Sequence, residues 1–243
     1  MESQSHQIML SDSIRVWDLP LRLFHWLLVI AIAVAFLSSE EGSPLSEWHI
    51  ASGWVVAVLI VFRLIWGFIG GEHSRFADFV KPSAIGHHVK DLFRARSKPS
   101  LGHNALGAVS ALLLLALIAA TVWTGIMMAE GGGEDIHELI AYVLLALVAV
   151  HILAVIVMSF LTRDNLVRAM IIGRKRAERH PEAREARRPT LFAYLLGALA
   201  IAGTIYAIVA YDPAAFELRS ADSFEHQDRD YGAGEHETDA EDD

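Results

Sequence analysis

Cysteine is absent from the 243 residues of this chain. Disulfides, cysteine-ligated zinc sites, iron–sulfur clusters and covalently attached c-type haem all need a thiol, so the sequence excludes each of them. Charged residues are also sparse, at 20%, whereas 53% of the residues are hydrophobic and the mean hydropathy is positive. Soluble domains are usually about 45–50% apolar. The excess lies in a few long runs, which indicates membrane spans instead of one large soluble core.

Five apolar runs are each long enough to cross a bilayer. An α-helix needs about 20 residues to span a hydrocarbon core of about 30 Å. The runs are continuous and lack the alternation of a β-barrel, and the first is a poor signal peptide because it contains charged and histidine residues. The sequence therefore predicts an all-α integral membrane protein, with spans at Leu19–Ser38, Trp48–Ile69, Leu106–Met128, Ile136–Leu161 and Leu191–Tyr211.

Basic residues between the runs predict the orientation of the chain. Two long connections, 71–102 and 162–189, carry six and nine Lys or Arg residues. The short connections 39–47 and 129–135 carry none, and each has three acidic residues. Because basic loops stay cytoplasmic, we expect the N-terminus to be cytoplasmic and the C-terminal tail to lie on the opposite side. Nothing in this charge pattern indicates a nucleic-acid partner.

Four histidines lie within the spans, where a polar group is expensive enough to suggest a function. His137 and His151 are 14 residues apart on one helix, so they share a face and are separated by roughly 21 Å along its axis. His49 begins the second span, at the level of His137. His25 lies roughly 20 Å below the outer end of the first span, at the level of His151. The sequence therefore predicts two histidine pairs at two depths.

Two stacked histidine pairs are typical of a membrane protein that holds two b-type haems. We expect His49 and His137 to ligate an outer haem iron, and His25 and His151 to ligate an inner one. Bis-histidine ligation closes both axial positions, which leaves a one-electron carrier. Histidines that only pack in a non-redox transporter or scaffold are an alternative. Zinc or copper is a weaker one, because two imidazoles per level supply too few ligands for a tetrahedral site.

Two arginines in the spans are candidates for contact with the cofactors. Arg63 is the only Lys or Arg deep in a span and reaches the inner level. It would pair with a haem propionate, or it would extend its guanidinium to the cytoplasmic surface. Arg22 lies one turn from His25 and four residues after Asp18. It would contact a propionate, or it would form a surface ion pair with Asp18.

His103 and Asn104 precede the third span at the inner surface. Both side chains would hydrogen-bond a quinone carbonyl or a propionate of the inner haem. The structural alternative is that Asn104 is an ordinary helix N-cap. The remaining histidines lie in polar loops, in the N-terminal arm or in the acidic tail, where we expect them to be solvated.

Several motifs together resemble the bacterial cytochrome b-561 family, which includes the b-type cytochrome subunits of Ni,Fe-hydrogenases. They are VWDLPLRLFHW at 16–26, FRLIWG at 62–67, RFADFV at 75–80, GHN at 102–104, NLVRAM at 165–170 and GRKR at 173–176. The resemblance implies a four-helix core, haem ligands on the first, second and fourth helices, the same four histidines, and quinone as the usual electron partner. The chain departs from the family at Ala105, where members often have proline, and in its fifth span.

With this resemblance, we expect five parts in the chain. They are a cytoplasmic arm (1–15), a four-helix di-haem cytochrome b domain (16–176), a basic cytoplasmic linker (177–190), a fifth transmembrane helix (191–211) and an acidic periplasmic tail (212–243). The tail holds twelve acidic and two basic residues within a net charge of −9, and we expect it to be disordered. The implied location is the bacterial inner membrane.

The leading functional hypothesis is electron transfer between the quinone pool and a periplasmic redox partner. That partner would be a c-type cytochrome or another oxidoreductase subunit, and the acidic tail would attract one with a basic face. We expect the chain to work within a larger complex or as a homodimer. A stand-alone oxidoreductase that couples a small external reductant such as superoxide to quinone reduction is the second hypothesis.

Overall fold

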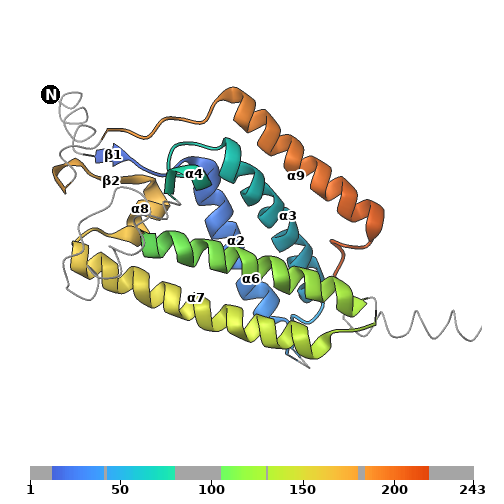
Figure 1. The fold of residues 1–243 in the computed structure, drawn as a ribbon. Coiled ribbons are helices and arrows are strands. Elements are labelled where there is room, and N and C mark those ends of the chain that lie inside the picture. Colours follow the sequence, from blue (N-terminus) through green and yellow to red (C-terminus); the bar gives the residue numbers. More distant parts are fainter. Residues whose placement is uncertain (1–12, 41–42, 80–104, 130, 180–183, 219–243) are drawn as a thin grey trace, which may run out of the picture.

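The computed structural model describes residues 13–40, 43–79, 105–129, 131–179 and 184–218. Five long helices dominate it (Figure 1), and all five are long and apolar enough to cross a membrane. They are α2 (Leu19–Leu37), α3 (Trp48–Ile69), α6 (Ala105–Ala129), α7 (Glu134–Thr162) and α9 (Leu191–Tyr211). Their bounds differ from the predicted spans by no more than two residues. The predicted all-α membrane fold, with four helices and a fifth, is confirmed.

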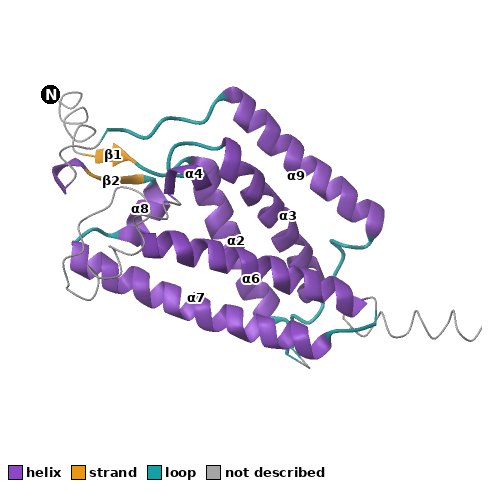
Figure 2. Ribbon diagram, viewed as in Figure 1, coloured by secondary structure: helices purple, strands orange, loops and turns teal. Residues whose placement is uncertain are grey.

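Helix α3 lies at the centre of the bundle, where it packs against α2, α6 and α9, while α6 packs against α7. The shared core is built mainly from side chains of α2, α3, α6 and α7, such as Phe24, Phe62, Ile118 and Leu144, and Ala193 of α9 joins it. Figure 2 shows that strands and loops are confined to the ends of these helices. The interior between the two ends is therefore formed by helix faces alone, as a bilayer requires of a spanning structure.

Several short elements gather at one end of the bundle. Strand β1 (Ser13–Arg15) pairs antiparallel with β2 (Arg174–Arg176), and α4 (Phe76–Phe79), α8 (Leu166–Ile172) and the 3-10 turn η1 (Ala177–Arg179) lie at the same end. We call the described residues 13–18, 70–79 and 163–190 the basic end, after the arginines and lysine they carry. The described residues 38–40, 43–47 and 131–133 form the opposite end, which we call the acidic end. Sequence reasoning did not predict the strands or α8.

Capping interactions set where the helices begin. The Asp18 carboxylate accepts a hydrogen bond from the backbone N–H of Leu21 at 2.9 Å, which starts α2. Thr190 caps α9 in the same way. Helix α7 starts two residues before the predicted span because Gly133, with a φ of 90°, turns the chain into it. Its first turn then holds two acidic residues, which the positive end of the helix dipole stabilises.

The fifth helix packs on α3 through a close approach at Gly197. A Cβ atom at this position would lie 3.1 Å from the Trp66 ring and 3.3 Å from the Phe62 ring. Farther along, Ile208 packs against Val58. Helix α9 therefore belongs to the bundle through α3, although it lies beyond the four-helix core, three of whose helices carry the candidate haem ligands.

Candidate haem sites

The outer histidine pair meets at the acidic end. His49 lies in the first turn of α3 and His137 in the first turn of α7. Their ring centres are 6.2 Å apart, and the ring planes are nearly perpendicular, at 82°. The structure therefore brings these two imidazoles together at one level, as helical rise predicts.

Both outer imidazoles are oriented by carbonyl oxygens through Nδ1. His49 Nδ1 lies 2.8 Å from the carbonyl oxygen of Ala35, and His137 Nδ1 lies 3.0 Å from that of Thr121, with the Thr124 hydroxyl at 3.1 Å. A carbonyl oxygen can only accept, so each Nδ1 carries the proton. Nε2 then keeps its lone pair. This is the arrangement that metal-binding histidines use, with the second nitrogen donating to a backbone carbonyl.

The outer pair fits the two axial positions of one haem iron. A metal–imidazole bond is about 2 Å long, so two imidazoles on one ion have ring centres roughly 6 Å apart once the ring radius is added. The observed separation of 6.2 Å matches this. Among the residues that the structure describes, no three His, Asp or Glu side chains gather into one metal site. Two imidazoles suit a porphyrin, whose ring supplies the other ligands, better than tetrahedral zinc.

The inner pair lies toward the basic end, on α2 and α7. His25 and His151 are close enough to interact electrostatically. The His25 ring packs edge-on against Trp26, with ring centres 5.1 Å apart. Its Nδ1 atom is buried and has no hydrogen-bond partner among the described residues. A buried polar nitrogen of this kind is costly unless it is satisfied, so the inner ring also fits an imidazole that takes part in a cofactor site.

Arg63 stays inside the protein near the inner level. Its side chain is only 4% exposed, and its guanidinium carbon lies 4.7 Å from the centre of the Phe76 ring. The Nη1 atom is buried and has no hydrogen-bond partner within the described part of the chain. One of the two sequence interpretations was that the guanidinium extends to the cytoplasmic surface. The structure does not support it, because the guanidinium is buried.

Arg22 has a partner that sequence reasoning missed. Its guanidinium donates to the backbone carbonyls of Met170 and Ile171, at the end of α8. The surface ion pair between Arg22 and Asp18, which was one of the two sequence interpretations, does not form among the described residues. The physical reason is that Asp18 is buried and its oxygens already accept from other donors, whereas the last carbonyls of a helix need partners.

Asp18 lies at the centre of a hydrogen-bond network that sequence reasoning did not find. Its carboxylate accepts from Ser74 Oγ at 2.6 Å, from Gly71 N–H at 3.1 Å, and from Trp66 Nε1 at 3.2 and 3.3 Å, in addition to the cap on Leu21. The network ties the start of α2 to the end of α3 and the turn after it. The only sequence signal was an Asp directly before Leu-Pro, which favours a helix cap.

The two remaining candidate residues, His103 and Asn104, lie outside the described residues. Their predicted contacts with a quinone or a propionate stay predictions.

A family comparison identifies the kind of bundle. The model of the prokaryotic cytochrome b561 family matches residues 16–173, which include all four membrane histidines. The chain belongs to the prokaryotic cytochrome b561 family. It is therefore a membrane b-type cytochrome, which implies haem b and electron transfer, and this supports a redox role over that of a transporter or scaffold.

Curated relatives agree with this family. A protein of Rhizobium leguminosarum bv. viciae is 25% identical over 214 residues, covering 68% of this chain and 89% of the relative. One of Azotobacter vinelandii is 25% identical, covering 66% and 88%, and one of Bradyrhizobium diazoefficiens is 23% identical, covering 67% and 86%. Each is named a "probable Ni/Fe-hydrogenase B-type cytochrome subunit". No solved structure gives a significant match.

The cytochrome b561 match leaves out part of the fold. It begins after β1 and ends before β2, so neither strand of the basic end lies within residues 16–173. Helix α9 also lies outside it. The family match covers the four-helix core, in which α2, α3 and α7 carry the histidines, and the fifth helix packs on α3 outside it.

Proposed function

We propose that this cytochrome is a two-haem electron-transfer subunit that connects the quinone pool to a redox partner on the other side of the membrane. In this proposal His49 and His137 hold the iron at the acidic end, and His25 and His151 hold the iron at the basic end. A bis-histidine b-type haem, when bound, supplies a one-electron couple between Fe(II) and Fe(III). The observation that carries the proposal is the facing outer pair, with each Nδ1 bound to a carbonyl oxygen.

The helices between the two levels would keep water away from the electron path. His137 and His151 are separated by roughly 21 Å along α7. Between these depths the bundle interior is filled by apolar side chains such as Leu28, Ile118 and Leu144, each less than a tenth exposed. A dry, low-dielectric interior disfavours proton leakage and side reactions beside a reduced centre.

Arg63 is proposed as the charge partner of the inner site. A buried guanidinium needs a compensating negative charge or hydrogen bonds, since an unpaired buried charge is strongly destabilising. Haem carboxylates at the basic end would supply the negative charge and also accept hydrogen bonds from the guanidinium. Asp18 contributes to the same balance, because it interacts electrostatically with Arg63 from the start of α2. Arg22, by contrast, is proposed to act on structure, through the end of α8.

The orientation follows from the charged ends. Because Lys and Arg residues are retained on the cytoplasmic side, we place the basic end in the bacterial cytoplasm and the acidic end in the periplasm, in the inner membrane. Quinone would then react near the inner site at the basic end, where His103 and Asn104 are the proposed contacts. The acidic tail at 212–243 would be periplasmic.

The partner is proposed to be an oxidoreductase subunit at the periplasmic side. The named relatives are hydrogenase subunits, which suggests a partner of that general kind. A c-type cytochrome is the other candidate. The twelve acidic residues of the tail would favour a basic face on either partner through long-range attraction. Deletion of the tail should therefore slow partner reduction most at low ionic strength.

Haem counting in single variants tests the proposal. We expect the purified chain to hold two haems, and His137→Leu or His49→Leu to lose one while the other keeps its spectrum. His151→Leu and His25→Leu should lose the other haem. The matched control is His73→Asn, since His73 lies outside the helices, with a φ of 70° that asparagine tolerates. Loss of both haems or of neither in a variant that still elutes as a folded protein would contradict the pairing.

A further inference from the structure

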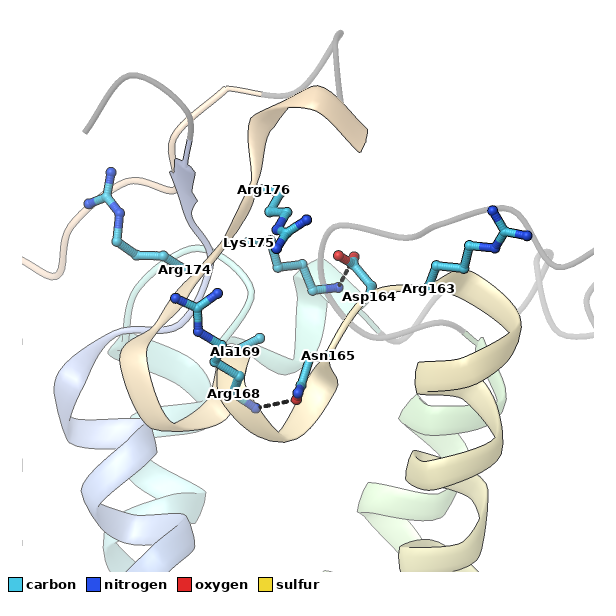
Figure 3. A pocket seen from close by; sticks show the side chains of 8 residues that line it. All are labelled: Arg163, Asp164, Asn165, Arg168, Ala169, Arg174, Lys175 and Arg176. Atoms are coloured by element: carbon cyan, nitrogen blue, oxygen red, sulfur yellow. Dashed lines mark hydrogen bonds and ion pairs between the residues drawn. The ribbon is translucent and has the colours of Figure 1, made fainter. Parts of the chain in front are cut away.

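A cavity of about 210 Å³ opens at the basic end, where α7 gives way to α8 and β2. Five of the eight residues that line it are basic, and only one is acidic (Figure 3). The basic residues are Arg163, Arg168, Arg174, Lys175 and Arg176. So many cations around one cavity repel one another unless anions compensate them.

Two of these cations are neutralised within the protein. Lys175 lies 3.7 Å from Asp164, and both side chains are buried, at 4% and 7% exposed. Burial lowers the pKa of the Lys175 ammonium, and the Asp164 carboxylate opposes that shift. The Arg174 guanidinium donates to Ser13 Oγ at 2.8 Å and pairs with Glu185 at 3.2 Å. Both interactions hold β2 in place, and Arg174 and Lys175 line the cavity on this side.

The other three cations have no such partner. Arg163, Arg168 and Arg176 are exposed, and their guanidinium groups make no hydrogen bond or ion pair with the residues that the structure describes. Arg168 does make one hydrogen bond, but through its backbone N–H, which donates to the Asn165 side chain. Figure 3 shows the Lys175–Asp164 pair between Arg163 on one side and Arg168 on the other. Three guanidinium groups that line the cavity are therefore open to an external anion.

The position of the cavity points to the membrane surface. Helix α7 ends at Thr162, and Arg163 is the next residue, so the cavity begins where the span ends. Helix α8 beside it exposes Val167 and Ile171 at 44% and 51%. A short helix with exposed apolar side chains next to arginines is typical of the boundary between headgroups and acyl chains. A soluble anion would make no favourable contact with those apolar side chains.

We propose that this cavity binds the phosphate group of an anionic phospholipid, with Arg163, Arg168 and Arg176 around the headgroup and the acyl chains along Val167 and Ile171. Guanidinium groups match phosphate oxygens in geometry as well as in charge. Basic pockets beside membrane helices are known to take lipid headgroups. A free phosphate ion shares this chemistry, but only the lipid also accounts for the apolar face of α8.

Lipid binding to the purified full chain tests the proposal. The haem-loaded protein is stripped of lipid in detergent, and native mass spectrometry measures the affinity for phosphatidylglycerol relative to phosphatidylcholine. Each basic residue near an anionic lipid contributes a factor of about five. The triple variant R163Q/R168Q/R176Q should therefore lose this preference on the order of 100-fold if the contributions are additive, and at least tenfold if they are not.

The matched control removes the same charge from the same end. The variant R184Q/R187Q/R188Q should keep its lipid preference, because these arginines do not line the cavity. An equal loss in both variants would overturn the proposal, since only net charge would then matter. Displacement of the lipid by millimolar inorganic phosphate would assign the cavity to a soluble anion and would also overturn it. An unchanged haem spectrum and elution volume confirm that each variant is folded.

Discussion

The buried carboxylate of Asp18 makes a sharp prediction about the stability of the bundle. In Asp18→Asn one oxygen becomes an amide group, while the shape is preserved. The natural Oδ2 atom accepts from Gly71 N–H and from Ser74 Oγ. The Ser74 hydroxyl can rotate and accept from an amide, but the Gly71 N–H can only donate. The variant therefore leaves one buried backbone donor facing another donor.

The magnitude follows from these bonds. A buried donor that loses its acceptor costs about 1–3 kcal/mol, and hydrogen bonds to a charged group are worth about 1.5–3 kcal/mol against about 1 for neutral ones. The loss of charge also weakens the bonds from Leu21 and Trp66. Together these effects predict a destabilisation of about 2–4 kcal/mol. For a chain of this size that corresponds to a decrease in Tm of about 5–15 °C.

Thermal melting followed by the Soret absorbance of the purified protein in detergent measures this change. Asp212→Asn is the matched control, since the Asp212 carboxylate also accepts from a tryptophan, Trp54 Nε1 at 3.1 Å, and from a backbone N–H. Asp212 is only half-buried, so water replaces a lost bond and the expected cost is below about 1 kcal/mol. Equal decreases in Tm for the two variants would refute the reasoning from burial.

Two further predictions concern the fifth helix and the loop before it. Gly197→Leu should destabilise the contact of α9 with α3 by about 1–3 kcal/mol, because the new side chain meets the Trp66 ring. The control is Gly203→Leu on the same helix, where a Cβ atom would have no neighbouring atom within 4 Å, and this variant should leave Tm unchanged. At Glu72, a hydrogen bond from Arg187 N–H lowers the pKa of the carboxyl from its ordinary value of 4.5. The ionised Glu72 carboxylate therefore stabilises the folded protein above pH 4.5, and this stabilisation is lost as the pH falls through the lowered pKa. Below about pH 4.5 the Tm of the wild-type protein should fall toward that of Glu72→Gln. A gap between these two melting curves that stays constant with pH would be incompatible with this origin.

The helices could be predicted because span length and hydropathy are local properties. Trp48–Ile69 and Leu191–Tyr211 agree in both bounds with the structure. Depth along a helix is equally local, since each residue adds a fixed rise. That is why the sequence alone predicts the meeting of His49 and His137. The start of α7 was missed by two residues because its turn depends on Gly133, which hydropathy does not register.

The basic end could not be predicted in the same way. Asp18 meets Ser74 across 56 residues, and Arg22 meets Ile171 across 149. Periodicity within one element carries no information about such distant partners. Strands of three residues are also too short to show alternation. The arginines at 163, 168 and 176 served in the sequence as a topological signal, and two of them also as parts of family motifs. Their arrangement around a cavity could not be predicted, because it depends on how α8 and β2 fold back.

The pairing of β1 with β2 has a consequence for biosynthesis. Ser13 leaves the ribosome early, but Arg174, whose side chain donates a hydrogen bond to it, follows 161 residues later. Closing so long a loop is entropically unfavourable and slow. The first helix therefore enters the membrane and packs on α3 before its N-terminal strand finds β2. In a nascent chain that stops short of residue 174, we expect the positions of α2 and α7 along each other to be poorly fixed. The inner histidines on these two helices would then reach their final positions late in assembly.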